Sequence, residues 1–217
     1  MPPFLRCQDD AVTQARPYGG VDAADRLARR RRRLLEAGLE LLGVDIDPAE
    51  VTVRGICQEA GLATRYFYES FSDKDQFIAA VFDWVIAEMA ATTQAAVAAA
   101  PAERQTRDGM ANIVRTIGAD PRVGRLMFGA QVSNTTVIRK RRESEALFVM
   151  LAGQHVQTLT RRPGNERIKA FAYFVVGGVT QTISAWLAGD ITLSPDELVD
   201  QLSAIVDAFG ESSLFRD

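Results

Sequence analysis

The sequence has few residues of the kinds that build disulfide frameworks, metal sites and catalytic triads. Among 217 residues there are two cysteines, Cys7 and Cys57, and one histidine, His155. Two cysteines so far apart do not form a disulfide framework, which fits a reducing cytoplasm. A lone histidine argues against a histidine-based metal site or triad, and no glycine-rich phosphate loop, CxxC pair or nucleophile elbow occurs. We therefore predict a protein that is not an enzyme, with no cofactor, metal site or catalytic residue.

Long apolar runs are also missing, as is the apolar–polar alternation that marks half-buried strands. No stretch reaches the roughly 18 apolar residues that suggest a membrane-spanning helix. The N-terminal segment MPPFLRCQDD carries acids where a signal peptide has its apolar run. We expect an all-α, cytoplasmic protein that is neither exported nor membrane-spanning.

Excess positive charge is absent, because the net charge is −3. Any DNA-binding surface must therefore be a local one. The length allows one or two domains, and 47% hydrophobic residues are enough for a sizeable core. Residues 1–25 contain prolines and glycines without periodicity, which predicts a flexible N-terminal extension.

The stretch from Thr52 to Lys74 predicts two short helices joined by a tight turn. Val53, Ile56, Cys57 and Ala60 are spaced as one apolar helix face. Gly61 ends that helix, since glycine adopts a positive φ without steric cost. A second helix then covers residues 64 to about 71. This pattern is typical of a helix-turn-helix, whose second helix can lie in the major groove of DNA.

The same stretch resembles the tetracycline-repressor (TetR) family of bacterial transcription regulators. The resemblance rests on an ordered set of motifs: Arg31-x-x-Leu34-Leu35-x-Ala37, Thr52-Val53-x-x-Ile56, Ala60-Gly61-Leu62, Phe67-Tyr68-x-x-Phe71 and Lys74-Asp75. It implies a three-helix helix-turn-helix DNA-binding domain over residues 26–72. A helical effector-binding and dimerisation domain would then occupy residues 73–217.

Nine residues of the predicted DNA-binding domain and its boundary are candidates for contacts with DNA. They are polar, basic or aromatic, and they are Arg31, Arg33, Thr52, Arg54, Thr64, Arg65, Tyr66, Tyr68 and Lys74. Arginine can pair with guanine and threonine can touch a thymine methyl, whereas the resemblance implies phosphate contacts for Thr52, Tyr68 and Lys74. The tyrosines could instead pack in the core, and Lys74 could be an ordinary solvated lysine. Phe67 and Phe71 should face inward.

Arg29–Arg33 form a run of five arginines before the helix-turn-helix. Such a run can be a solvated helix start or an arm that reaches DNA phosphates or a narrow minor groove. Both interpretations stay open at this point, although five cations near a helix N-terminus oppose its macrodipole.

The remaining helices follow from capping signals and apolar spacing. We expect helices at 73–99, 102–118, 120–131, 134–160, 165–187 and 195–209. Ser72 should cap the first of these with Asp75 completing a capping box, and Ser194 with Glu197 should do the same for the last. The helix over 73–99 would be about 40 Å long, so it should carry into the second domain and link it mechanically to the first.

A series of methionine, phenylalanine and other apolar residues lies between the predicted head and the end of the chain. Each could simply be core, but together they fit an adaptable apolar pocket for a small lipophilic effector, as the resemblance implies. The candidate ligand-binding residues are Phe82, Met89, Met110, Met127, Phe128, Phe148, Leu151 and Phe174. Gln131, Asn134, Gln154 and His155 could supply polar contacts.

The last two predicted helices each carry an apolar seam suited to helix packing. The seams comprise Val176, Val179, Ile183 and Trp186, then Leu198, Leu202, Ile205 and Phe209. They could form one monomer core, but they match the place where the TetR family pairs its protomers, so we expect a homodimer.

The resemblance implies a ligand-responsive transcriptional regulator, more often a repressor, that binds a palindromic operator in double-stranded DNA and is released by a small lipophilic effector. Two alternatives remain: a ligand-insensitive architectural DNA-binding protein, and a helical lipid-carrier or interaction protein with a vestigial helix-turn-helix.

Overall fold

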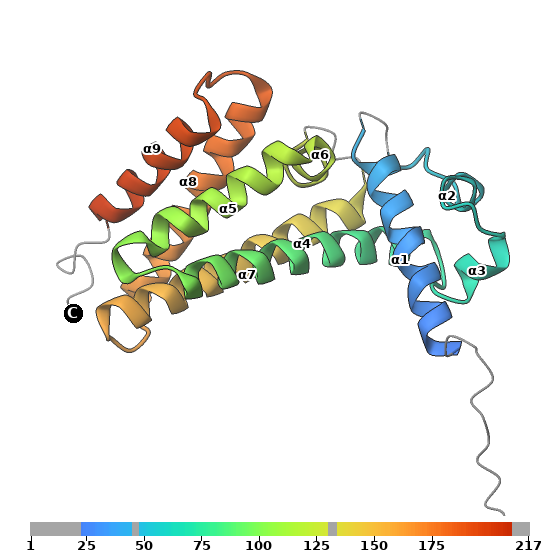
Figure 1. Ribbon diagram of the computed structural model, residues 1–217, viewed down its shortest axis with the longest axis horizontal. Helices are drawn as coiled ribbons and strands as arrows, with labels where there is room; N and C mark the ends of the chain where they lie inside the picture. Colours follow the sequence, from blue (N-terminus) through green and yellow to red (C-terminus); the bar gives the residue numbers. More distant parts are fainter. Residues whose placement is uncertain (1–22, 45–47, 130–133, 210–217) are drawn as a thin grey trace, which may run out of the picture.

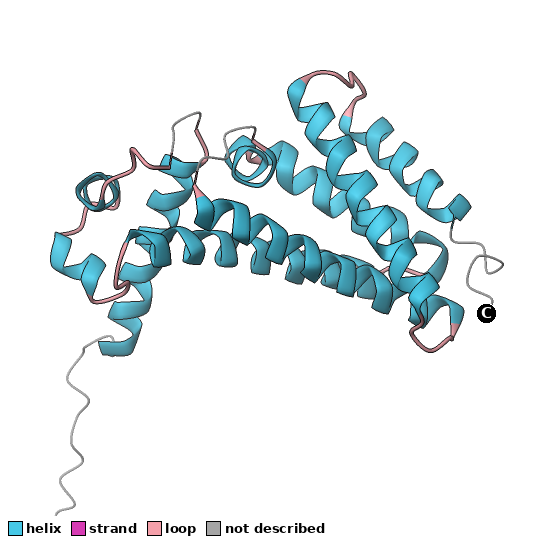
Figure 2. Cartoon of the chain, turned by 180° about the vertical axis from the view of Figure 1, so that it is seen from behind, coloured by secondary structure: helices cyan, strands magenta, loops and turns pink. Residues whose placement is uncertain are grey.

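The computed structural model describes residues 23–44, 48–129 and 134–209, and within these ranges every regular element is a helix, as predicted (Figures 1 and 2). The elements are α1 (Ala23–Leu42), α2 (Val53–Glu59), α3 (Thr64–Tyr68), α4 (Lys74–Ala99), a 3₁₀ turn (Ala102–Arg104), α5 (Gln105–Ala119), α6 (Pro121–Phe128), α7 (Thr135–Thr160), α8 (Glu166–Ala188) and α9 (Pro195–Phe209).

Helices α1, α2 and α3 form a small head at one end of the molecule (Figure 1). Its centre is built from side chains that are almost fully buried, among them Leu34, Ile56 and Phe67. The rings of Phe67, Phe71 and Phe77 meet with centroids 5.1–5.5 Å apart, which joins α3 to the start of α4. Phe67 and Phe71 therefore face inward, as the sequence predicts.

Two helix boundaries in the head differ from the expected ones. Helix α1 already begins at Ala23, so the arginine run lies inside the helix and not ahead of it. Helix α3 ends at Tyr68, and residues up to Phe71 continue as a turn in which the amides of Ser70 and Phe71 both donate to the Phe67 carbonyl.

The predicted cap of α4 is wrong by one residue. Asp73, and not Ser72, is the N-cap, and its carboxylate accepts from the amide of Gln76. The side chain of Gln76, and not that of Asp75, reaches back to the amide of Ser72. The arrangement is close to a capping box, except that Gln76 accepts from the amide of Ser72, one residue before the cap, and not from that of Asp73.

Helix α4 leaves the head and runs into the body of the protein, where it packs against α5 and α7 (Figures 1 and 2). It meets α1 at Gly38, where an added Cβ would lie 2.6 Å from the ring of Phe77 and 2.5 Å from Val81. Only glycine allows α1 and α4 to approach this closely. The expected link between head and body is therefore present in α4.

The body consists of α5–α9, and one buried core extends from Leu34 in α1 to Leu202 in α9. Helix α9 begins as predicted: the Ser194 hydroxyl accepts from the amide of Glu197, whose carboxylate accepts from the Ser194 amide and hydroxyl. Asn165 caps α8, which ends at Ala188 and is followed by Gly189 with a φ of 84°.

Among the described residues, α8 alone has the length and apolar composition of a membrane-spanning helix. This is weak evidence for a membrane, because a helix of a soluble protein can pass the same test.

Candidate DNA interface and ligand cavity

Helix α3 presents a polar face to solvent at the outer edge of the head. Thr64, Arg65 and Tyr68 are exposed, with Tyr68 at 60% of its full accessibility, whereas Phe67 on the opposite side is fully buried. The ring of Phe67 meets that of Tyr68 edge-on at 5.3 Å, which steadies the exposed tyrosine. A short helix anchored on its apolar side and free on its polar side has the geometry that groove binding requires.

Tyr66 sits between two arginines. Arg30 lies 4.2 Å above its ring and Arg65 lies 4.6 Å from it, and Arg65 also donates to the Tyr66 hydroxyl at 2.6 Å. Arg30 in turn pairs with Glu69 at 2.7 Å. Tyr66 is half-buried, and the guanidinium groups of Arg30 and Arg65 both pack against its ring.

Two arginines predicted to contact DNA are used inside the head. Arg31 donates to the carbonyl of Ser70 at 3.0 Å and covers the ring of Phe71. Arg33 donates to the carbonyl of Ala60 at 2.7 Å. Both tie α1 to the helix-turn-helix while they remain exposed, so their contact with DNA stays a prediction.

Lys74 is engaged in a similar way. Its ammonium donates to the carbonyls of Ala49 at 3.0 Å and Pro48 at 3.4 Å, which fastens the segment before α2 to the start of α4. Its role as a phosphate contact stays a prediction, and the structure adds a structural role that the sequence did not indicate.

The other candidates belong to α2 and its N-cap. The Thr52 hydroxyl accepts from the amide of Gly55 at 3.1 Å and caps α2, as predicted, and Arg54 in the first turn of α2 is exposed. Behind them the thiol of Cys57 is buried, and burial raises its pKa while a hydrogen bond with Thr64 lowers it.

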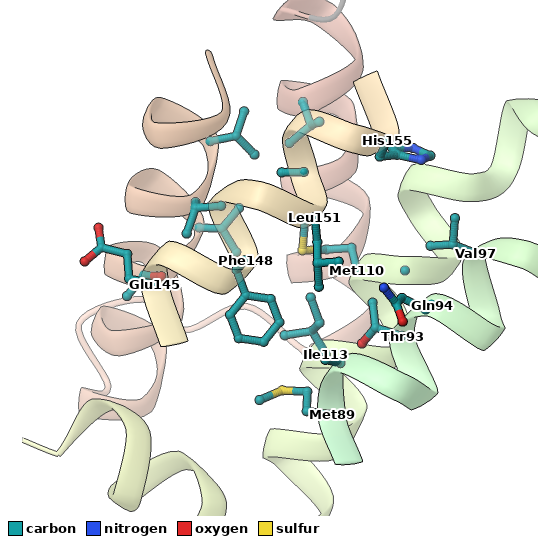
Figure 3. Close-up of a pocket in the computed structure, with 18 of the residues that line it drawn as sticks. Met89, Thr93, Gln94, Val97, Met110, Ile113, Glu145, Phe148, Leu151 and His155 are labelled. Carbon is teal, nitrogen blue, oxygen red and sulfur yellow. The ribbon is translucent and has the colours of Figure 1, made fainter. Parts of the chain in front are cut away.

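The body contains a cavity of about 650 Å³ between α4, α5, α7 and α8 (Figure 3). In the close-up, Phe148, Leu151, Ile113 and Met89 lie between Glu145 on one side and His155 on the other. The size and apolar lining suit a small organic ligand.

Six of the eight predicted ligand-binding residues line this cavity, namely Met89, Met110, Met127, Phe128, Phe148 and Leu151. The other two, Phe82 and Phe174, do not line it. Phe82 is 1% exposed in the core beneath the head, and Phe174 is 62% exposed on the outer side of α8. Their helices were predicted, but the face each helix turns toward the cavity depends on tertiary packing.

Of the predicted polar contacts, Gln154 and His155 line the cavity, Asn134 instead caps α7, and Gln131 lies outside the described residues. The Nε2 atom of His155 is buried without a hydrogen-bond partner. Desolvation lowers the pKa of His155, while Asp207 acts in the opposite direction. Burial therefore favours the neutral imidazole, which can form one hydrogen bond with a ligand.

Arg141 is a lining residue that sequence reasoning missed, because the run around it resembles an ordinary solvated helix face. Its guanidinium donates to the carbonyls of Gly129 at 2.8 Å and Leu126 at 3.0 Å, at the end of α6. Burial lowers the pKa of Arg141, and none of the described carboxylates forms an ion pair with it.

Most residues predicted for the dimer interface are turned into the protomer. Ile183, Leu198 and Leu202 are at most 3% exposed, so the structure contradicts their placement on a dimer surface. Val176 and Val179 line the cavity, and the indole of Trp186 donates to the Leu193 carbonyl at 2.8 Å. Ile205 is 40% exposed, and the side chain of Phe209 lies outside the described residues.

No group of three or more His, Cys, Asp or Glu side chains that could hold a metal occurs in the described ranges.

The fold is shared with many solved structures, whereas no family model and no curated protein matches the sequence. A regulator from Pseudomonas aeruginosa PAO1, described as putative, is 19% identical, with a TM-score of 0.69 over 87% of this chain and 94% of that one. FadR from Bacillus subtilis, solved with stearoyl-CoA, is 13% identical, with a TM-score of 0.67 over 81% and 96%.

A regulator from Syntrophomonas wolfei, described as a putative TetR-family member, is 10% identical, with a TM-score of 0.70 over 84% of this chain and 95% of that one. These likenesses agree with the motifs between Arg31 and Asp75. The chain has the fold of the TetR family of transcriptional regulators.

Proposed function

We propose that this protein is a ligand-responsive, DNA-binding transcriptional regulator that acts as a homodimer in the cytoplasm. The observation that carries the proposal is the exposed polar face of α3, anchored from behind by the buried Phe67. Arg65, Thr64 and Tyr68 lie on that face, and these residue types read base edges and phosphates in a major groove. Repression is the commoner mode in the family that the sequence resembles.

A dimer follows from the requirement for two heads on one operator, since one short helix binds weakly and two gain from effective concentration. The outer side of α8 supports a pairing surface that differs from the predicted one. Tyr173 and Phe174 are 50% and 62% exposed there. Gly177 and Gly178 have open space where a Cβ would lie, so a second helix could approach closely.

The cavity supports the effector part of the proposal. It lies beside α4, the helix that joins head and body, so a bound molecule can favour one placement of the head over another. A ligand acts only through its different affinities for the two arrangements. FadR, of the same fold, was solved with stearoyl-CoA, which supports a lipophilic effector here as well.

The test is DNA binding measured by fluorescence anisotropy on a duplex selected from random sequences. Arg65→Ala should relax discrimination at one position of each half-site, by roughly 1–3 kcal/mol for a bidentate base contact. Arg115→Ala, which removes an exposed arginine of α5 in the body, is the matched control and should change nothing. Equal discrimination by the wild type and Arg65→Ala would contradict the assignment of α3.

The alternatives are separated in the same assay. A ligand-insensitive architectural protein would bind the duplex equally with and without lipophilic compounds. A carrier with a vestigial head would bind such compounds and show no preference among duplexes.

A further inference from the structure

We propose that the effector is an amphiphile with an anionic head group, and that Arg141 binds this group and thereby loosens the end of α6. This inference rests on the proposed function, since it names the class of molecule and the coupling at the same cavity. It starts from the guanidinium of Arg141, a half-buried cation at the edge of an otherwise mostly apolar cavity.

The hydrogen bonds of Arg141 leave it without charge neutralisation. Its Nε, Nη1 and Nη2 atoms make four contacts of 2.8–3.4 Å, all with carbonyls of Arg125, Leu126 and Gly129. Carbonyls at a helix C-terminus favour a cation but carry only partial charge. A carboxylate or phosphate supplies a full charge and stronger, charge-assisted bonds. The site is therefore suited to an anion.

The rest of the cavity determines what that anion must be attached to. Arg141 and His155 are separated along α7 by about four helical turns, or roughly 21 Å. The lining between them is apolar and includes Phe148 and Leu151. His155, with its unpartnered Nε2, lies at the far end (Figure 3). A long apolar chain with an anionic head matches this arrangement better than a compact neutral molecule does.

Two other charged residues line the cavity, and neither competes for the same role. Glu145 and Arg142 are both exposed, so water solvates them. Glu145 forms no ion pair with Arg141 in the described structure, although the two are four residues apart on α7. The control for Arg141 is therefore Arg115, an exposed arginine of α5 that does not line the cavity.

Binding at Arg141 must disturb α6. A guanidinium has five N–H donors, and carbonyl contacts engage four of them at most. A bidentate carboxylate needs two donors, so it competes with these contacts, and at least one of the four hydrogen bonds to the end of α6 is weakened or lost. The end of this short helix, from Arg125 to Gly129, then loses part of its cap.

Helix α6 also contacts the head. Arg122 pairs with Glu40 of α1, and Arg125 donates to the carbonyl of Gly43 at 3.1 Å. A shift of α6 would therefore move α1. Helix α1 would in turn move the helix-turn-helix, to which Arg31 and Arg33 bind it. The anion would act on the head by this second path, besides α4.

The experiment compares laurate with lauryl alcohol, which share a chain and differ in charge, in calorimetric titrations of the full-length protein. Laurate should bind the wild type at least about tenfold more tightly than the alcohol. Arg141→Met should remove this preference, and Arg115→Met should keep it. Arg141→Lys, which retains a point charge without the fork, should keep part of it. Circular dichroism melts check that each variant is folded.

Hydrogen exchange supplies the regulatory readout: laurate should reduce the protection of amides in α6 in the wild type and not in Arg141→Met. Equal affinities for acid and alcohol, or a preference that survives Arg141→Met, would overturn the proposal.

Operator binding is measured on the same preparations. If the protein shows no selectivity among duplexes while its affinity for laurate still depends on Arg141, the proposed regulator function is contradicted and the anion site is not. If selectivity is present and laurate binding does not depend on Arg141, the anion site fails alone.

Discussion

At the scale of single residues, the arginines of the head show that one side-chain type has several uses within a few positions. Arg31 and Arg33 hold α1 to the helix-turn-helix, and Arg32 pairs with Glu36 and covers the ring of Trp84. Arg54 and Arg65 remain on the exposed surface of α2 and α3. Effects on stability and effects on DNA binding should therefore separate within this set.

Arg33→Met and Arg54→Met test that separation. Arg33→Met should lower the free energy of unfolding by about 1 kcal/mol, because it leaves the Ala60 carbonyl without its charged donor. Arg54→Met should leave stability unchanged and weaken binding to all duplexes, with a shallower salt dependence. Urea denaturation and anisotropy measure the two effects. The opposite assignment, with Arg33 acting only on DNA, would contradict the structure.

His155 should make stability dependent on pH. Desolvation lowers its pKa in the folded state, so the unfolded chain binds a proton more readily. Stability therefore falls as pH falls through about 6.5, the ordinary pKa of histidine, and continues to fall until the folded pKa is reached. His155→Gln should flatten the stability profile between about pH 7 and pH 5. Urea midpoints across this range provide the measurement, and an unchanged slope would count against a buried neutral imidazole.

At the scale of elements, the close contact between α1 and α4 at Gly38 fixes the position of the head relative to the body. Gly38→Ala would push a methyl group into Phe77 and Val81, which are fully buried and have no room to retreat. Overpacking of this kind costs roughly 1–3 kcal/mol and should outweigh the gain in helix propensity.

Gly118→Ala on α5 is the control for that substitution, since its added Cβ would meet Trp186 at an ordinary 3.7 Å. This variant should be neutral or slightly more stable. Thermal melts of the two variants compare the effects, and equal melting temperatures would contradict the close α1–α4 contact.

Most elements could be predicted from the sequence because their signals are local. The helix-turn-helix, the Thr52 cap, and the Ser194 and Glu197 capping box depend on residues a few positions apart. What could not be predicted depends on distant partners. The acceptors of Arg141 lie at the end of another helix, and the faces that Phe82 and Phe174 present depend on how α4 and α8 pack. Ile183 and Leu198 carry seam patterns that fit a protomer core as well as a dimer.

At the scale of the whole molecule, the proposal depends on two heads held at a fixed spacing. Phe174→Glu on the exposed face of α8 should convert a dimer into monomers, because it would bury a charge without a partner in the pairing surface. Operator affinity should fall sharply as the gain from effective concentration is lost.

Ala91→Glu, at an exposed position of α4, is the control for the α8 substitution. It should remain dimeric and bind the operator normally. Size-exclusion chromatography with light scattering reports the mass. A Phe174→Glu dimer with full operator affinity would place the pairing surface elsewhere.

The most direct test of the central claim is selection of bound duplexes from random DNA by the full-length protein at moderate salt. The account predicts enrichment of one palindromic sequence, with two half-sites spaced for α3 helices in successive major grooves. Recovery of duplexes with no sequence in common, bound no better than scrambled DNA, would contradict it.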